Sequence, residues 1–304
     1  MRSEGRMFNN LLNKFKLQNI VGKFIYANVA VYIIVVLIGV FSVLFNAGNI
    51  GQQLVGCLEL PSSLALLLHR PWSILTYMFL HEHFMHILWN MLALYVFGKI
   101  FIDFYSLRHF VGTYILGGVF GGVAFVLSYN LFPYFAPYVE TARLVGASAS
   151  VLAIVVASAV RNPGYRINLL LVGSVKLSTF AIITVAISLF MLAGDNAGGN
   201  FAHIGGAVAG WLVAWLLNKG IDITAVVNKP IDWFAMLLKK EAYRRKPKAK
   251  FKYSHGGRSA DYEYNARKKA SEAEVDKILE KIKKGGYASL TDDEKKRLFD
   301  ASSK

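Results

Sequence analysis

The sequence predicts an all-α, polytopic membrane protein: a bundle of six transmembrane helices with a small cytoplasmic helical extension at the C-terminus. Hydrophobic residues make up 55% of the 304 residues and charged residues only 17%, a balance more apolar than that of soluble domains. Six apolar segments approach the length of about 20 residues that a helix needs to cross the hydrocarbon core. Lysine and arginine collect on one side of these segments, as the positive-inside rule describes.

The six expected spans lie at 24–45, 83–104, 110–132, 145–160, 177–193 and 202–217. The last three are short, which predicts that they are tilted or begin below the membrane surface. The loop after the first span is too apolar to be fully solvated, and Pro71 interrupts it. We expect this loop to lie partly in the membrane interface, with Trp72 and Tyr77 as its anchors.

Basic residues set the orientation of the spans. The three expected outer loops, 46–82, 133–144 and 194–201, contain only Arg70 and Arg143 of the 34 lysines and arginines. Because cytoplasmic loops carry the excess of basic residues, both termini are expected in the cytoplasm. The net charge of +15 then belongs to inner loops and tails, and nucleic acid is not an expected partner.

Four segments are expected along the chain: a cytoplasmic N-terminal lead-in (1–20), the six-span core (21–219), a basic juxtamembrane segment with a linker (220–270) and a small cytoplasmic helical hairpin (271–304). The basic stretch at 239–252 predicts attraction to anionic lipid heads. Two capping boxes, Ser271–Glu274 and Thr291–Glu294, indicate where the two helices of the hairpin begin.

Polar groups suited to chemistry stand at the outer ends of the second, fourth and sixth spans. His86 and Asn90 are four residues apart and therefore share one face of the second span. Ser148 begins the fourth span and His203 begins the sixth. Since all three spans start on the outer side, these side chains are expected to converge at a similar depth.

Ionisable groups at membrane depth are costly and tend to be functional. A serine becomes a nucleophile when a base lies within hydrogen-bond reach, and His203 is the candidate base for Ser148. Attack on an amide creates an oxyanion, for which His86, Asn90 and the Ser148 backbone N–H are the candidate donors. Ser150 points about 200° around the helix from Ser148 and is interpreted as a packing serine.

Small residues on two of the spans favour this convergence. Gly206 and Gly210 follow His203 on the sixth span, and Ala149 and Ala153 lie on the fourth. Close approach of helices in membranes relies on such small-residue faces. We therefore expect the fourth and sixth spans to pack tightly, which would bring His203 to Ser148.

Three motifs together resemble the rhomboid family of intramembrane serine proteases: "GASA" around Ser148, "HILWN" after a histidine-rich loop, and "AHIGGAVAG" at His203. The resemblance covers roughly residues 21–219, in the order of the motifs and in the six-helix layout. It implies a rhomboid-like bundle and a Ser–His dyad without an acidic third member, which cleaves transmembrane segments near the membrane surface. It assigns Ser148 as the nucleophile, His203 as the base, and His86 and Asn90 to the oxyanion hole.

Three positions differ from the residues common in that family. Ala149 follows the nucleophile where glycine is often found, and Leu152 stands where an aromatic commonly stacks on the catalytic histidine. Ser73 follows Trp72 where arginine is often found. None of the three is a catalytic group.

Metal chemistry fits the residues less well. His81, His83 and His86 suggest a metal cluster, but only Glu82 accompanies them at a loop-to-helix junction. The metalloprotease pattern H-E-x-x-H begins at His81 and fails at Met85. Neither a metal nor another cofactor is therefore expected.

Other classes are set aside on similar grounds. An intramembrane aspartyl protease would need Gly-x-Gly-Asp, and "LAGD" at 192–195 lacks the first glycine. The glycines of the third span suggest a transporter, but no intramembrane charge relay accompanies them. With Cys57 as the single cysteine, no intrachain disulfide is possible. The remaining alternative is a catalytically weak or inactive rhomboid-like adaptor that binds transmembrane helices.

The functional expectation is therefore an intramembrane serine endopeptidase whose partners are transmembrane protein substrates. Its cavity is expected to open to the outside and to be lined by His86, Asn90, Ser148 and His203. The fifth span and the glycine-rich loop "AGDNAGGN" before His203 are expected to form its moving edge. Because no signal or transit segment is evident, a multi-pass protein of the bacterial inner membrane is expected.

Overall fold

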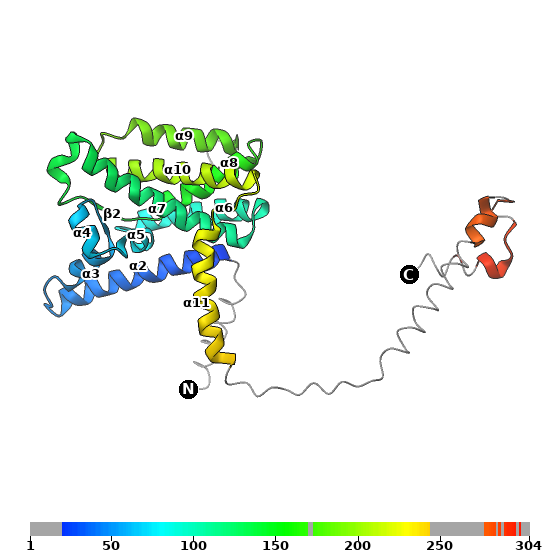
Figure 1. Cartoon of the computed structure of the whole chain (residues 1–304), viewed down its shortest axis with the longest axis horizontal. Helices are drawn as coiled ribbons and strands as arrows, with labels where there is room; N and C mark the ends of the chain where they lie inside the picture. Colours follow the sequence, from blue (N-terminus) through cyan, green and yellow to red (C-terminus); the bar gives the residue numbers. More distant parts are fainter. Residues whose placement is uncertain are drawn as a thin grey trace. The chain divides into compact units, whose positions relative to one another are not determined.

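The structure is a computed structural model, and it describes residues 20–169, 173–243, 277–283, 285–286, 289–295 and 298. The chain divides into two compact units, Met1–Lys240 and Glu241–Lys304. The described part of the first unit is built mainly of helices (Figure 1).

Among the described residues, four helices are long and apolar enough to cross a membrane: α2 (Ile20–Leu44), α6 (Phe84–Phe104), α7 (Leu107–Leu131) and α10 (Ala197–Asn218). Two shorter apolar helices, α8 (Ser148–Arg161) and α9 (Leu177–Phe190), lie between α7 and α10 in the chain. Each of the six coincides with a segment expected as a span. The protein is therefore a helical integral membrane protein.

The two short helices have 14 residues each. At a rise of 1.5 Å per residue each is about 21 Å long, shorter than the hydrocarbon core of about 30 Å. Their shortness agrees with the sequence-based expectation for these two segments. The expected third short span is different, because α10 begins five residues earlier than predicted, at Ala197, and has 22 residues.

Helix α10 packs along α7 and α8 (Figure 1). A methyl group added at Gly206 or Gly210 would overlap the carbonyl groups of Ala149 and Ala153 on α8. From the other side, Gly121 of α7 approaches Ala149 so closely that an added Cβ would lie 2.5 Å from the alanine Cβ. The predicted small-residue packing of the fourth and sixth spans is therefore confirmed.

The connection between α2 and α6 folds into short helices rather than a loose interfacial loop. They are α3 (Ile50–Leu58), α4 (Leu64–His69), α5 (Ser73–Thr76) and the 3-10 helix η1 (Tyr77–Phe79). Strand β1 (Leu60–Pro61) pairs antiparallel with β2 (Arg143–Leu144), just before α8. This pairing fastens the first connection to the segment that leads into Ser148.

The two predicted interface anchors behave differently. Trp72 is half exposed, and its indole N–H donates to the carbonyl of Cys57 at 2.8 Å. Tyr77 is only 1% exposed, and its hydroxyl donates to the carbonyl of Gly118 on α7 at 2.6 Å. The prediction that Tyr77 anchors the loop in the membrane interface was wrong: it is a core residue that fixes the connection to α7.

Short elements lie between the long helices of the first unit. The 3-10 helix η2 (Pro133–Tyr138) follows α7, and strands β3 (Arg166–Leu169) and β4 (Gly173–Lys176) form an antiparallel pair between α8 and α9. The all-α prediction is correct for the bundle and omits the two strand pairs, which are short and lie in connections.

A helix, α11 (Ala225–Tyr243), occupies part of the segment expected to be a basic juxtamembrane segment with a linker. Asp232 pairs with Arg108 at 2.9 Å, and the Asn228 amide donates to the Arg108 carbonyl at 3.1 Å. Thr224, just before the helix, packs against Gly112. These contacts attach α11 to the start of α7.

In the second unit, Thr291 and Glu294 form the predicted capping box. The Thr291 N–H donates to the Glu294 carboxylate at 2.8 Å, and the Glu294 N–H donates to the Thr291 hydroxyl at 3.4 Å. Ile278 and Leu290 are buried in this unit. Residues 1–19 of the predicted lead-in (1–20) and the capping box at Ser271–Glu274 lie outside the described residues.

Candidate active site

Ser148 is the first residue of α8, and the residue before it, Ala147, offers no side-chain cap. The first N–H groups of a helix have no partner within it, so the backbone at Ser148 presents donors at a helix N-terminus. Gly146 turns the chain with φ +119°, a conformation that strains other residues, and its N–H donates to the carbonyl of Tyr77 at 3.0 Å. A tight turn fixed to the core thus positions Ser148.

His86 packs directly against this turn. A Cβ placed on Gly146 would lie 2.7 Å from Nε2 of His86, so only glycine leaves room for the imidazole. Asn90 lies one turn further along α6, is 8% exposed, and donates one amide hydrogen to the His86 carbonyl at 2.8 Å. The second amide hydrogen of Asn90 remains for another acceptor.

A cavity of about 700 Å³ opens where α6, α8 and α10 begin. His86, Asn90 and Ser148 line it, together with Asp195 and Asn196 before α10. Three of the four residues predicted to line a common cavity therefore do so. His203 is not among the lining residues, so the prediction was wrong for that side chain.

His203 lies in the second turn of α10, at the same level of the bundle as Ser148. A Cβ on Gly121 would be 2.5 Å from the Ala149 Cβ and 2.9 Å from the Ala202 carbonyl. Ala149 follows Ser148 and Ala202 precedes His203, so both site residues lie next to a residue that contacts Gly121. The His203 ring is half-buried, and its Nδ1 lies 3.1 Å from the hydroxyl of Ser188 on α9.

Ser150 differs from Ser148 in its surroundings. It is fully buried, and an added Cβ on Gly118 would come within 2.9 Å of its hydroxyl oxygen. The hydroxyl faces α7 rather than the cavity, as expected of a packing serine.

Two glycines of the expected mobile loop lie in a helix. Gly198 and Gly199 form part of the first turn of α10 and are buried, and the Asn196 side chain caps this turn by accepting from the Gly199 N–H at 3.3 Å. A Cβ on Gly198 would lie 2.8 Å from the Phe125 ring. These glycines allow close packing, so the prediction that they belong to a flexible loop was wrong.

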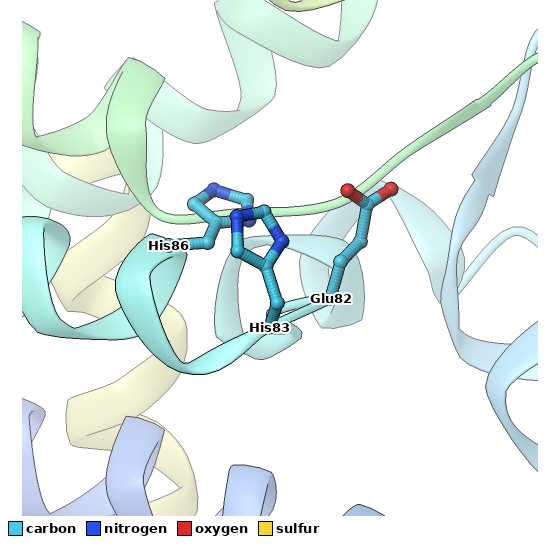
Figure 2. Close-up of side chains that lie close together, drawn as sticks. All are labelled: Glu82, His83 and His86. Carbon is cyan, nitrogen blue, oxygen red and sulfur yellow. The ribbon is translucent and has the colours of Figure 1, made fainter.

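Glu82, His83 and His86 line the cavity and lie close together (Figure 2). The possible ligand atoms of Glu82, His83 and His86 all lie within 4.8 Å of one another. Tetrahedral zinc holds its ligands at about 2.0–2.2 Å, which requires donor atoms about 3.5 Å apart. These side chains would have to close in to bind such an ion, and the absence of a metal stays a prediction.

Sequence reasoning missed several residues of the site. Ser188 is one of four hydroxyl residues on α9, and hydroxyls in helices commonly bond to their own backbone, so nothing in the pattern distinguished it. Trp89 and Tyr129 also line the cavity. Trp89 shares the "HILWN" motif with Asn90, which is the one signal that could have identified it.

Comparison with known families places the site within a recognised domain. Residues 68–220, half of the chain, match the Rhomboid domain family. Residues 258–304 match a family of unknown function (DUF6576). No curated protein matches the chain. The Rhomboid match includes all four predicted site residues: His86, Asn90, Ser148 and His203.

Proposed function

Because the chain belongs to the rhomboid family, we propose that it is an intramembrane serine endopeptidase. It cleaves transmembrane segments of other membrane proteins near the outer membrane face. The observation that carries the proposal is the position of Ser148: it begins α8 without a side-chain cap and lines a polar cavity together with His86 and Asn90.

In the proposed reaction His203 takes the proton of Ser148 while the serine oxygen attacks the carbonyl carbon of the scissile amide. The carbonyl oxygen becomes an oxyanion, for which the Asn90 amide, the His86 ring and the Ser148 backbone N–H are the donors. The protonated His203 then gives its proton to the leaving amine. Water from the cavity repeats the sequence on the acyl-enzyme and restores Ser148.

The same proposal concerns the membrane arrangement. We take α2, α6, α7, α8, α9 and α10 as six spans with both termini in the cytoplasm, in a bacterial inner membrane. The support is the scarcity of basic residues in the expected outer loops. Substrates are transmembrane helices that carry helix-weakening residues near their outer end, because an intact helix hides its carbonyls within its own hydrogen bonds.

Two further parts of the proposal concern the C-terminal region. The basic stretch 239–252 is proposed to meet anionic lipid heads. The segment 271–304 is proposed to be a small cytoplasmic helical hairpin that takes no part in the chemistry.

A fluorophosphonate probe, which reacts with activated serines, tests the proposal directly. The purified protein in detergent is expected to become labelled, and Ser148→Ala is expected to abolish the labelling. Ser150→Ala, two residues away and facing α7, serves as the matched control and is expected to keep it. No labelling of the folded wild-type protein, or labelling that survives Ser148→Ala, would favour an inactive adaptor and overturn the proposal.

A further inference from the structure

The side chain of His203 has one hydrogen-bond partner among the described residues, the hydroxyl of Ser188 on α9. The Ser188 oxygen and the His203 Nδ1 are 3.1 Å apart. Ser188 is 2% exposed, so water does not compete freely for this contact. The partner of the ring therefore belongs to a different helix from the histidine itself.

A count of hydrogens decides which atom donates. The Ser188 oxygen lies 3.1 Å from the Thr184 carbonyl and 3.1 Å from His203 Nδ1. A serine hydroxyl has one hydrogen to donate and a carbonyl has none. Both contacts are hydrogen bonds only if Ser188 donates to Thr184 and accepts a hydrogen from Nδ1 of His203.

This arrangement determines the tautomer of the histidine. A neutral imidazole that carries its hydrogen on Nδ1 has its lone pair on Nε2. The nitrogen away from α9 is then the one free to accept a proton from a serine. When it does so, the Nδ1–H bond to Ser188 remains and holds the charged ring in place.

We propose that Ser188 is a positioning residue for the base: it selects the Nδ1–H tautomer of His203 and fixes the direction of the ring. The inference rests on the proposed function of His203. In a Ser–His dyad without an acidic third member, the Ser188 hydroxyl and the Thr184 carbonyl behind it supply a neutral substitute for the group that orients the base in other serine hydrolases.

The variants Ser188→Ala and Ser188→Thr separate the hydroxyl from the packing. The matched control is Ser178→Ala, which removes a serine hydroxyl in the first turn of α9 that bonds to the Pro163 carbonyl. Ser188→Ala is expected to lower the maximal rate of fluorophosphonate labelling by about 3- to 10-fold, the effect of one neutral hydrogen bond. The probe concentration at half saturation is expected to stay unchanged, and Ser188→Thr is expected to restore the rate.

Nitrogen-15 NMR of the histidine rings measures the tautomer of His203, which would not change if Ser188 had only a packing role. With the signal of His203 assigned through His203→Gln, the wild-type ring is expected to show a protonated Nδ1. Ser188→Ala is expected to shift the population towards the other tautomer, while Ser178→Ala leaves it unchanged. An unaltered tautomer and labelling rate in Ser188→Ala, or an equal fall in the labelling rate of Ser178→Ala, would overturn the inference.

These results are distinguishable from a failure of the proposed function. If wild-type labelling does not depend on Ser148, the protease assignment fails. If labelling depends on Ser148 but neither its rate nor the tautomer depends on Ser188, the inference fails alone.

Discussion

Asn90 donates one of its two amide hydrogens to the helix that carries it, and this bond holds the side chain against the cavity wall. The second hydrogen is the proposed oxyanion donor. Because removal of one such donor usually costs about 10²- to 10³-fold in rate, Asn90→Ala is expected to lower kcat on a model transmembrane substrate by that factor. Asn130→Ala is the control, since Asn130 bonds to the Ser62 carbonyl outside the cavity. Equal activity of the two variants would show that Asn90 has a packing role and is not an oxyanion donor.

His81 is expected to make the stability of the protein depend on pH. It is 6% exposed, and burial, with a smaller contribution from His86, lowers its pKa from 6.5 to about 4. Above pH 6.5 the ring is neutral in both the folded and the unfolded chain. Between pH 6.5 and 4 the unfolded chain binds a proton that the folded chain does not, so the free energy of unfolding falls, by about 3 kcal/mol at most.

Thermal unfolding in detergent at pH 7 and pH 5 measures this effect. His81→Phe keeps a ring but cannot titrate, so it is expected to lose less stability on acidification than the wild-type protein. His69→Gln, at an exposed histidine on α4, is expected to behave as the wild type. The same pH response in all three proteins would show that His81 does not carry the effect.

The candidate site could be predicted at residue scale where the sequence holds a motif. Ser148 lies in a motif that contains Gly146, and His86 and Asn90 share one helical face. These spacings can be read directly from the sequence. The partner of His203 could not be predicted from the sequence. The contact with Ser188 joins residues on two helices and depends on the rotation of α9 about its axis. Hydropathy does not encode that rotation in a helix that is apolar on every side.

At the scale of elements, the close packing of α8 and α10 can be tested through glycine. Gly206→Val would place side-chain atoms into the Ala149 carbonyl, which forces the helices apart and moves His203 relative to Ser148. Overpacking of this kind costs about 1–3 kcal/mol, so we expect lower thermal stability and lost labelling. Gly39→Val on α2 meets no atom within 4 Å of the new Cβ and is expected to retain both. Full labelling of Gly206→Val would show that the spacing of these helices is not critical.

Helix positions followed from hydropathy, whereas the connections did not. The six apolar helices need no partner to satisfy their backbone groups in lipid, so composition and length suffice to predict them. The strand pair β1–β2 joins residues more than 80 positions apart, from Leu60 to Leu144. Tyr77 looked like an interface anchor because an aromatic with a hydroxyl suits that place, but the carbonyl of Gly118 offers its hydroxyl a buried acceptor. Such pairings depend on the assembled bundle.

For the whole molecule, the central physical problem is water. The proposed hydrolysis requires water beside Ser148, which begins a membrane helix. The short length of α8 and the polar cavity above its first residue address this together, since the cavity walls include Asp195 and Asn196 as well as Ser148. Exposed apolar side chains on α2, such as Ile34 and Leu37, suit contact with lipid. The bundle thus combines a lipid-facing exterior with a cavity whose polar lining suits water.

The side on which this cavity opens can be measured with one cysteine. Ser148→Cys in a Cys57→Ser background places the single thiol at the position of the proposed nucleophile, since Cys57 is the only native cysteine. A membrane-impermeant maleimide added to intact cells is expected to label it, because the proposed topology, based on the few basic residues in the expected outer loops, directs the starts of α6, α8 and α10 outward. Arg161→Cys, at the opposite end of α8, is the matched control and is expected to react only after the membrane is permeabilised. Labelling at 148 from the cytoplasmic side alone would show that the bundle has the opposite orientation. Substrates would then be cleaved near the cytoplasmic face.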